Sequence, residues 1–231
     1  MTLIRSISGI RGTIGGLPQE GLTPPDLVLF TTAFAALIRK KTGKQRIALV
    51  IGRDARVSGP MVSQIVTGTL LGCGVDVMDI GLSTTPTVEM SVTGLNADGG
   101  IILTASHNPA NWNALKLLNG NGEFISAEEG EELLAIAGAG GSLYADAGQL
   151  GSYASVEGRI AEHIREILQL PLVDAAAICE RDFMVAFDAI NSTGGIAIPM
   201  LLEALGVKRM KGIHTDPSGL FAHNPEPIPE N

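Results

Sequence analysis

Apolar residues alternate along the chain between short continuous runs and stripes with helical spacing. Continuous runs at residues 46–52, 75–81 and 99–105 predict buried strands, because each is short and ends in glycine or polar residues. A longer stripe begins after Thr23-Pro24, a typical helix start, and stops near Gly43. Similar stripes predict helices at about residues 60–71, 86–92, 127–137, 156–168 and 195–205, with further strands at 183–187 and near Lys208.

Strands that alternate with helices predict an α/β fold with a largely parallel sheet. Residues 113–125 combine an apolar run with an Asn-Gly pair, which predicts a β-hairpin. We expect a first domain at residues 1–140, a Gly- and Ala-rich linker at 141–154, and a second domain at 155–231. The second unit has about half the elements of an independent α/β domain, so we expect it to be incomplete and the native protein to be longer.

Composition narrows the class of protein. The hydrophobic share is 45% and the net charge is −8, so we expect a soluble, cytoplasmic protein with neither nucleic acid nor membrane as a partner. The two cysteines, Cys73 and Cys179, have no metal or redox spacing and are expected to be free thiols that pack as small hydrophobic residues. The first 60 residues carry nine Lys and Arg against three Asp and Glu, a local charge that suits a small anion.

The sequence Thr104-Ala105-Ser106-His107-Asn108-Pro109 follows a predicted strand directly and is too polar and stiff to continue it. Open α/β sheets bind ligands beyond the carboxyl ends of their strands, so this loop is expected to face a crevice. A serine that carries phosphate would bring a charge of about −2 to that crevice. The cations available to meet it are Arg11, expected in a glycine-flanked turn, Arg53 and Arg56 after another strand, His107, and Lys116 in the hairpin.

A serine hydrolase is a second interpretation of Ser106 and His107. It is weaker, because adjacent residues rarely let a histidine reach its neighbour's hydroxyl, and no G-x-S-x-G motif is present. The other histidines, His163, His214 and His223, are expected to have surface or structural roles.

The motif "TASHNP", followed by Asn113 and Lys116 and preceded by "GIRG" and "GRDARVSG", resembles the α-D-phosphohexomutase superfamily. The resemblance implies three-layer α/β/α sandwich domains with a mixed sheet, and part of a second similar domain here. It also implies that Ser106 is a phosphoserine whose phosphate helps to bind Mg²⁺, with Arg11, His107 and Lys116 in catalysis. Arg53, Arg56, Asn108 and Asn113 would bind phosphate or substrate. Trp112-Asn113-Ala114 stands where relatives usually have Asn-Gly, so the backbone at Ala114 is expected to differ slightly.

The activity implied is interconversion of hexose 1- and 6-phosphates through a sugar bisphosphate, most simply with glucose or mannose phosphates. A phosphoglucosamine mutase and a non-catalytic phosphosugar-binding module are the alternatives. The remaining Mg²⁺ ligands and the loops that select the sugar are expected beyond residue 231, so the chain alone is expected to be inactive. Its oligomeric state is left open.

Overall fold

A single mixed sheet organises most of the chain. The computed structural model describes residues 2–6, 9–140 and 144–230. The strands are β1 (Ile4–Ser6), β2 (Gly9–Thr13), β3 (Ala48–Arg53), β4 (Asp76–Leu82), β5 (Gly99–Leu103), β6 (Trp112–Leu118), β7 (Tyr153–Ser155), β8 (Met184–Asp188) and β9 (Arg209–Ile213). The helices are α1 (Pro24–Thr42), α2 (Gly59–Gly72), α3 (Thr85–Gly94), α4 (Ala127–Gly138), α5 (Arg159–Leu168), α6 (Ala175–Glu180) and α7 (Gly194–Ala204), with a 3-10 turn at Ala147–Gln149.

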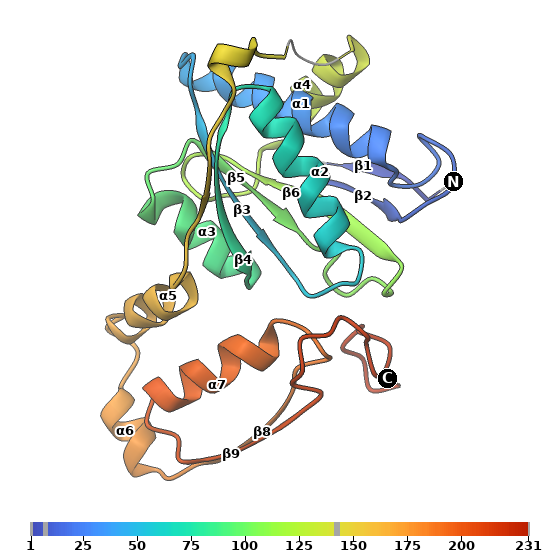
Figure 1. The fold of residues 1–231 in the computed structure, drawn as a ribbon. Helices are drawn as coiled ribbons and strands as arrows, with labels where there is room; N and C mark the ends of the chain where they lie inside the picture. The colour runs from blue at the N-terminus through green and yellow to red at the C-terminus, as the bar shows by residue number, and fades with distance from the viewer. Residues whose placement is uncertain (1, 7–8, 141–143, 231) are drawn as a thin grey trace.

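The seven-stranded sheet has the order β1-β2-β6-β5-β3-β4-β7. Strands β5, β3, β4 and β7 are parallel, whereas β6, β2 and β1 are joined by antiparallel pairings. Helices α1, α2 and α4 cover one face and α3 covers the other (Figure 1), and each face has its own buried apolar cluster. The predicted three-layer α/β/α fold with a mixed sheet is therefore confirmed.

Local signals explain why the first helix lies where the sequence predicts. The N–H of Thr23 donates to Asp26 Oδ2 at 3.0 Å, which closes a capping box at the start of α1. Gly43 ends the helix in a left-handed conformation with φ 68°, and its N–H donates to Arg39 O. The stripe between these residues fills the larger apolar cluster, and its Phe34 is fully buried.

The N-terminal segment and the predicted hairpin differ from expectation. Arg11 lies in β2, paired with Ile4 on one side and Ala114 on the other, and not in a glycine-flanked turn. Strand β6 pairs with β5 and β2, so the Asn-Gly turn returns the chain through a single bridge between Leu118 and Phe124. The backbone groups of β2 thus form hydrogen bonds with β6, a strand about 100 residues away that the local sequence pattern does not reveal as a partner.

Part of the predicted linker belongs to the main sheet. Strand β7 pairs with β4, so residues 153–155 extend the first unit; residues 141–143 lie outside the described ranges. A side chain at Gly151 would place its Cβ 1.8 Å from Val75 O, so only glycine permits this close approach. The glycine content that indicated a linker instead lets the segment lie against β4.

The second unit consists of the two parallel strands β8 and β9 with α5, α6 and α7. The sequence did not predict helix α6. It has six residues, and the Asp174 side chain caps its start by accepting from the Ala177 N–H. Both cysteines are free, with Cys73 buried and Cys179 half-buried. Among the described residues, no helix is long and apolar enough to cross a membrane.

Candidate active site

The backbone of Ser106 is held in an uncommon conformation directly after β5. Its φ of 56° lies in the left-handed region. This conformation costs a non-glycine residue about 1–3 kcal/mol and persists only where the surrounding structure enforces it. The Ser106 N–H donates to Thr104 Oγ1 at 3.1 Å, and that hydroxyl donates to Asp54 Oδ2 at 2.6 Å. These two bonds hold the turn from below, while the Ser106 side chain stays exposed.

Arg56 supports the same loop from the interior. Its side chain is fully buried, and its Nε donates to Asp54 Oδ2 at 3.1 Å. The two terminal nitrogens donate to four loop carbonyls, those of Ser106, Asn108, Pro109 and Trp112, at 2.6–3.1 Å. A guanidinium has five N–H donors, and these five bonds use all of them. The geometry therefore gives Arg56 a loop-shaping role in place of the phosphate contact that the sequence predicted.

A small hollow of about 200 Å³ opens beside Ser106. It is lined by Arg11, Thr104, Ala105, Ser106, His107, Ala114 and Lys116. Arg11 and Lys116 reach it from neighbouring strands, because Arg11 is paired with Ala114, two residues before Lys116 on the same face of β6. Ala114 continues a regular strand here, so the departure from the usual Asn-Gly leaves the pairing intact.

One nitrogen of the Arg11 guanidinium is unpaired within the described part of the chain. Its Nε is buried and has no hydrogen-bond partner among the described residues. Leaving a charged donor unpaired is costly, and the positive charge of Arg11 at the hollow favours an anion there. Ser106 carrying a phosphate, or the phosphate of a ligand, fits this requirement.

The Lys116 ammonium is half-buried and lies near other charged groups. Half-burial lowers the pKa of its ammonium, and the nearby Arg11 charge lowers it further, while Glu89 and Asp54 act in the opposite direction. A lysine whose pKa is below its ordinary value releases a proton more readily near neutral pH. Its Nζ also lies 5.6 Å from the centre of the Phe124 ring, which restricts where the side chain can point.

His107 does not form a strong bond with its neighbour. Its Nδ1 is 3.5 Å from Ser106 Oγ, longer than the roughly 2.5–3.0 Å typical for a hydroxyl donor. Elsewhere in the described chain, His163 contacts Thr87, and His214 and His223 contact Asp188. Nothing in this arrangement activates Ser106 as a hydrolase nucleophile.

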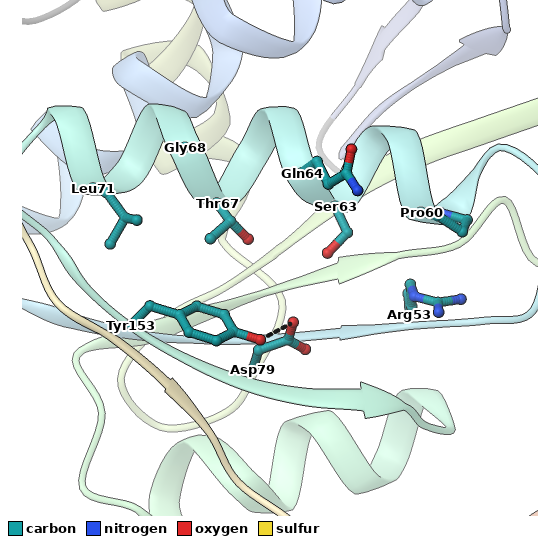
Figure 2. A pocket seen from close by; sticks show the side chains of 9 residues that line it. All are labelled: Arg53, Pro60, Ser63, Gln64, Thr67, Gly68, Leu71, Asp79 and Tyr153. Carbon is teal, nitrogen blue, oxygen red and sulfur yellow. Dashed lines mark hydrogen bonds between the residues drawn. The ribbon is translucent and has the colours of Figure 1, made fainter.

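Three other predicted residues lie outside the hollow. Arg53 instead lines a separate pocket of about 470 Å³ under α2 (Figure 2), together with Asp79 and Tyr153. Asn113 is fully buried, and its Nδ2 donates to Ser58 Oγ at 2.9 Å, so it ties β6 to the start of α2. Asn108 takes part in the loop through its backbone, which accepts from Arg56 and donates to Ala105 O.

Sequence reasoning gave no role to Asp54 and Thr104, which connect the loop to the sheet. Asp54 accepts from Thr104, from the Arg56 backbone N–H and from Arg56 Nε. A signal was present, because a carboxylate between two arginines at a strand end is costly to bury unless they are paired. What the sequence could not show is that the partner hydroxyl comes from the loop after β5, 50 residues away.

A strand-end serine with a left-handed backbone conformation, beside the cationic side chains of Arg11 and Lys116, gives this α/β/α domain a hollow suited to an anion. The model of the family described as phosphoglucomutase/phosphomannomutase, alpha/beta/alpha domain I, matches residues 3–142. This chain belongs to the phosphoglucomutase/phosphomannomutase family.

Relatives agree with this membership. A Thermococcus kodakarensis protein named phosphoglucomutase/phosphomannomutase is 37% identical over 95% of this chain and 48% of its own length. A Sulfurisphaera tokodaii phosphoglucosamine/phosphogalactosamine mutase is 32% identical over 95% of this chain and 46% of its own. The chain thus spans about half the length of the curated relatives that it matches.

A solved structure gives the same result at the level of the fold. The crystal structure of a Thermus thermophilus protein, described provisionally as a phosphomannomutase, matches with a TM-score of 0.81 at 26% identity. The match covers 100% of this chain and 50% of the other. Both units of the chain therefore belong to one architecture that is found in this family.

Proposed function

We infer that the protein of which this chain is a part is a phosphohexose mutase that uses Ser106 as its phosphoryl carrier. The observation that carries this proposal is the hollow in which Ser106 faces Arg11, His107 and Lys116. Cations at about 4 Å from a phosphate are each worth roughly 4 kcal/mol at an effective dielectric constant near 20. Such positioning and charge neutralisation account for most of the catalysis of phosphoryl transfer.

In the forward step, the bond between phosphorus and Ser106 Oγ breaks as the free hydroxyl of a hexose monophosphate attacks. The product is a hexose bisphosphate, and the hydroxyl proton passes to a base while Ser106 Oγ regains a proton. Lys116, with its lowered pKa, and His107 are the groups placed to carry these protons. The reverse reaction, with the sugar turned round, returns the other phosphate to Ser106.

Members of this family are generally metal-dependent, and the resemblance implies Mg²⁺. Mg²⁺ commonly binds one or two carboxylates together with phosphate oxygens. Among the residues that line the hollow, a phosphorylated Ser106 would supply the phosphate oxygens. Asp54, the carboxylate beneath the loop, already accepts from Thr104 and Arg56. The described residues therefore fit one part of a Mg²⁺ site, whose ion would neutralise charge on the transferred phosphoryl group.

Glucose and mannose phosphates are the first candidate substrates, because the relative that is 37% identical is named phosphoglucomutase/phosphomannomutase. A phosphoglucosamine mutase is the second candidate, because the Sulfurisphaera tokodaii relative, at 32% identity, is named phosphoglucosamine/phosphogalactosamine mutase.

The domain boundaries proposed from the sequence need one adjustment. Strand β7 belongs to the first sheet, so the second unit would begin at α5.

The test is phosphorylation of the protein extended to the length of its relatives by a ³²P-labelled hexose 1,6-bisphosphate, with the labelled residue identified by mass spectrometry. We expect label on Ser106 in the wild type and none in Ser106→Ala, because Thr104, the nearest hydroxyl in sequence, is bonded to Asp54. In the protein extended to the length of its relatives, the same change is expected to abolish mutase turnover. Ser192→Ala, on the second unit, is the matched control. Equal labelling of Ser106→Ala would contradict the assignment of Ser106 as carrier.

A further inference from the structure

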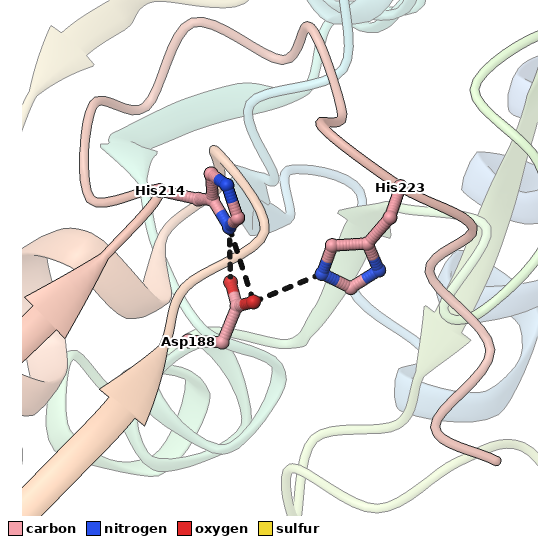
Figure 3. Close-up of side chains that lie close together, drawn as sticks. All are labelled: Asp188, His214 and His223. Atoms are coloured by element: carbon pink, nitrogen blue, oxygen red, sulfur yellow. Dashed lines mark hydrogen bonds and ion pairs between the residues drawn. The ribbon is translucent and has the colours of Figure 1, made fainter. Parts of the chain in front are cut away.

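Three side chains from separate segments of the second unit meet at one point (Figure 3). Asp188 ends β8, His214 directly follows β9, and His223 lies in the segment beyond. Asp188 lies between the two imidazoles, with Oδ1 and Oδ2 each 3.1 Å from His214 Nδ1 and Oδ2 2.9 Å from His223 Nε2. One potential ligand atom from each residue lies within 4.8 Å of the other two.

The hydrogen bonds of the His223 ring indicate that a cation is needed between His223 Nε2 and the Asp188 carboxylate. His223 Nδ1 is 2.9 Å from Asn224 O, and a carbonyl oxygen only accepts, so Nδ1 carries a proton. In the neutral ring, Nε2 then turns its lone pair toward a carboxylate oxygen 2.9 Å away. Two acceptors at that distance repel one another unless a proton or a metal ion is shared between them.

The carboxylate is also held in place from its own strand end. Its Oδ1 accepts a hydrogen bond from the Ile190 N–H at 2.8 Å. An ionised carboxylate and two ring nitrogens form the donor set of many three-residue metal sites. The imidazole whose other nitrogen is bonded to a backbone carbonyl also has the orientation that metal-binding histidines usually have.

We propose that Asp188, His214 and His223 bind a divalent transition-metal ion of the zinc class. Tetrahedral zinc has bonds to imidazole nitrogen of about 2.0–2.1 Å, which places neighbouring ligand atoms roughly 3.3 Å apart. The observed separations of 2.9 and 3.1 Å from the Asp188 carboxylate are close to that value, and the two imidazole nitrogens, which lie within 4.8 Å of each other, would move together to complete the site. Nitrogen donors favour zinc over Mg²⁺, which prefers oxygen, and three protein ligands leave a fourth position for water.

The ion would also fasten a segment that reaches the first unit. Between His214 and His223, Gly219 lies so close to the loop after β3 that an added Cβ would be 1.9 Å from Ala55 O. The ring of Phe221 covers the Arg56 guanidinium, with 5.1 Å from Cζ to the ring centre. Arg56 in turn holds the carbonyls of the Ser106 loop. A metal ion bound by Asp188, His214 and His223 would therefore restrain the segment between the two histidines, which packs against the arginine that supports this loop.

Zinc titration of the chelator-treated chain by isothermal calorimetry tests the proposal. We expect one ion per chain in the wild type, and affinity lowered at least tenfold in Asp188→Asn and in His223→Gln, since even outer-shell changes cost about 10–100-fold. His163→Gln is the matched control, because His163 contacts Thr87 and lies outside the cluster. A Cys179→Ser variant should bind as the wild type does, which separates the cluster from the half-buried thiol.

Two spectroscopic readouts distinguish a metal from a shared proton. Co²⁺ in place of zinc should give the visible bands of a tetrahedral ion in the wild type and lose them in His223→Gln. Zinc should slow amide hydrogen exchange at residues 214–224 in the wild type and leave it unchanged in His223→Gln. Circular dichroism verifies that the variants fold. Absence of stoichiometric zinc binding by the wild type, or affinity that Asp188→Asn leaves unchanged, would overturn the proposal.

Discussion

The two units of this chain are built from the same kinds of element but are stabilised very differently. In the first, strands such as β5 are buried along their whole length between two helical layers. In the second, β8 and β9 alternate exposed and half-buried positions, and the buried apolar residues of the described part are Ile164, Ala189 and Val207. Met184 is 76% exposed, although it begins a strand of parallel type.

Parallel sheets normally have both faces covered, because their connections place helices on each side. A two-stranded sheet with one covering helix removes little apolar surface from water, and apolar burial is the main favourable term in folding. The comparison shows that backbone pairing is shared by both units while core burial is not. We therefore expect substitutions of equal chemistry to have large effects in the first unit and small effects in the second.

The largest difference is expected for two arginines that each pair with an aspartate. Removing one partner of a buried ion pair costs about 3–5 kcal/mol, whereas an exposed pair contributes about 0–1 kcal/mol. Arg56→Met should therefore lower the free energy of unfolding strongly, since Arg56 is fully buried. Arg209→Met, where the Arg209 side chain is 54% exposed beside Asp182, should change it little. Urea denaturation of both variants measures the difference, and equal losses would show that the two units are stabilised alike.

The next largest difference concerns apolar side chains in parallel strands. Leu49 in β3 is completely buried, so Leu49→Ala is expected to cost about 2–5 kcal/mol through lost burial and a cavity. Met184→Ala in β8 should stay within about 0.5 kcal/mol, as for most surface changes. Thermal and urea unfolding followed by circular dichroism give both values. A Met184→Ala loss as large as that of Leu49→Ala would mean that this face of β8 is covered in solution.

A smaller effect should reveal how the two units are coupled. Phe221 lies over Arg56, and a cation–π contact is worth about 0.5–2 kcal/mol depending on how far it is desolvated. Phe221→Ala is therefore expected to destabilise the first unit by an amount in that range, although the residue lies in the second. A double-mutant cycle with Arg56→Met isolates the contact. Additive losses in the cycle would mean that Phe221 and Arg56 do not interact.

The smallest effect is expected at the edge of the first unit, in acid. Hydrogen bonds from Arg46, followed by those from Ser152, hold the pKa of Asp76 well below its ordinary value. A carboxylate with a lowered folded-state pKa contributes stability above its unfolded pKa of about 3.9 and loses that contribution as the pH falls. Asp76→Asn should thus be less stable than wild type at pH 7, by no more than about 1 kcal/mol because the pair is exposed. The two curves of stability against pH should begin to approach each other near pH 4 and converge only as the pH falls through the lowered folded-state pKa of Asp76. A gap that stays constant would refute the role of the Asp76 charge.

Local signals in the sequence were enough to predict most of the first unit. The helix from Pro24 to Thr42 has its capping box and terminal glycine within its own residues. The β3 and β5 strands follow from short apolar runs, because central parallel strands are buried on both faces, whereas β4, next to the short edge strand β7, is buried only at Val77 and Ile80. The motif at Ser106 likewise identified the family whose model matches residues 3–142.

Long-range pairing decided what the sequence alone could not. Arg11 looked like part of a glycine turn, yet the antiparallel pairing of β2 with β6 places it beside Ala114 and the hollow. Arg56 looked like a phosphate ligand, but five acceptors gathered around it from Asp54 and a loop about 50 residues away. A buried charge must satisfy all of its donors, and only the folded chain determines whether protein or ligand supplies the acceptors.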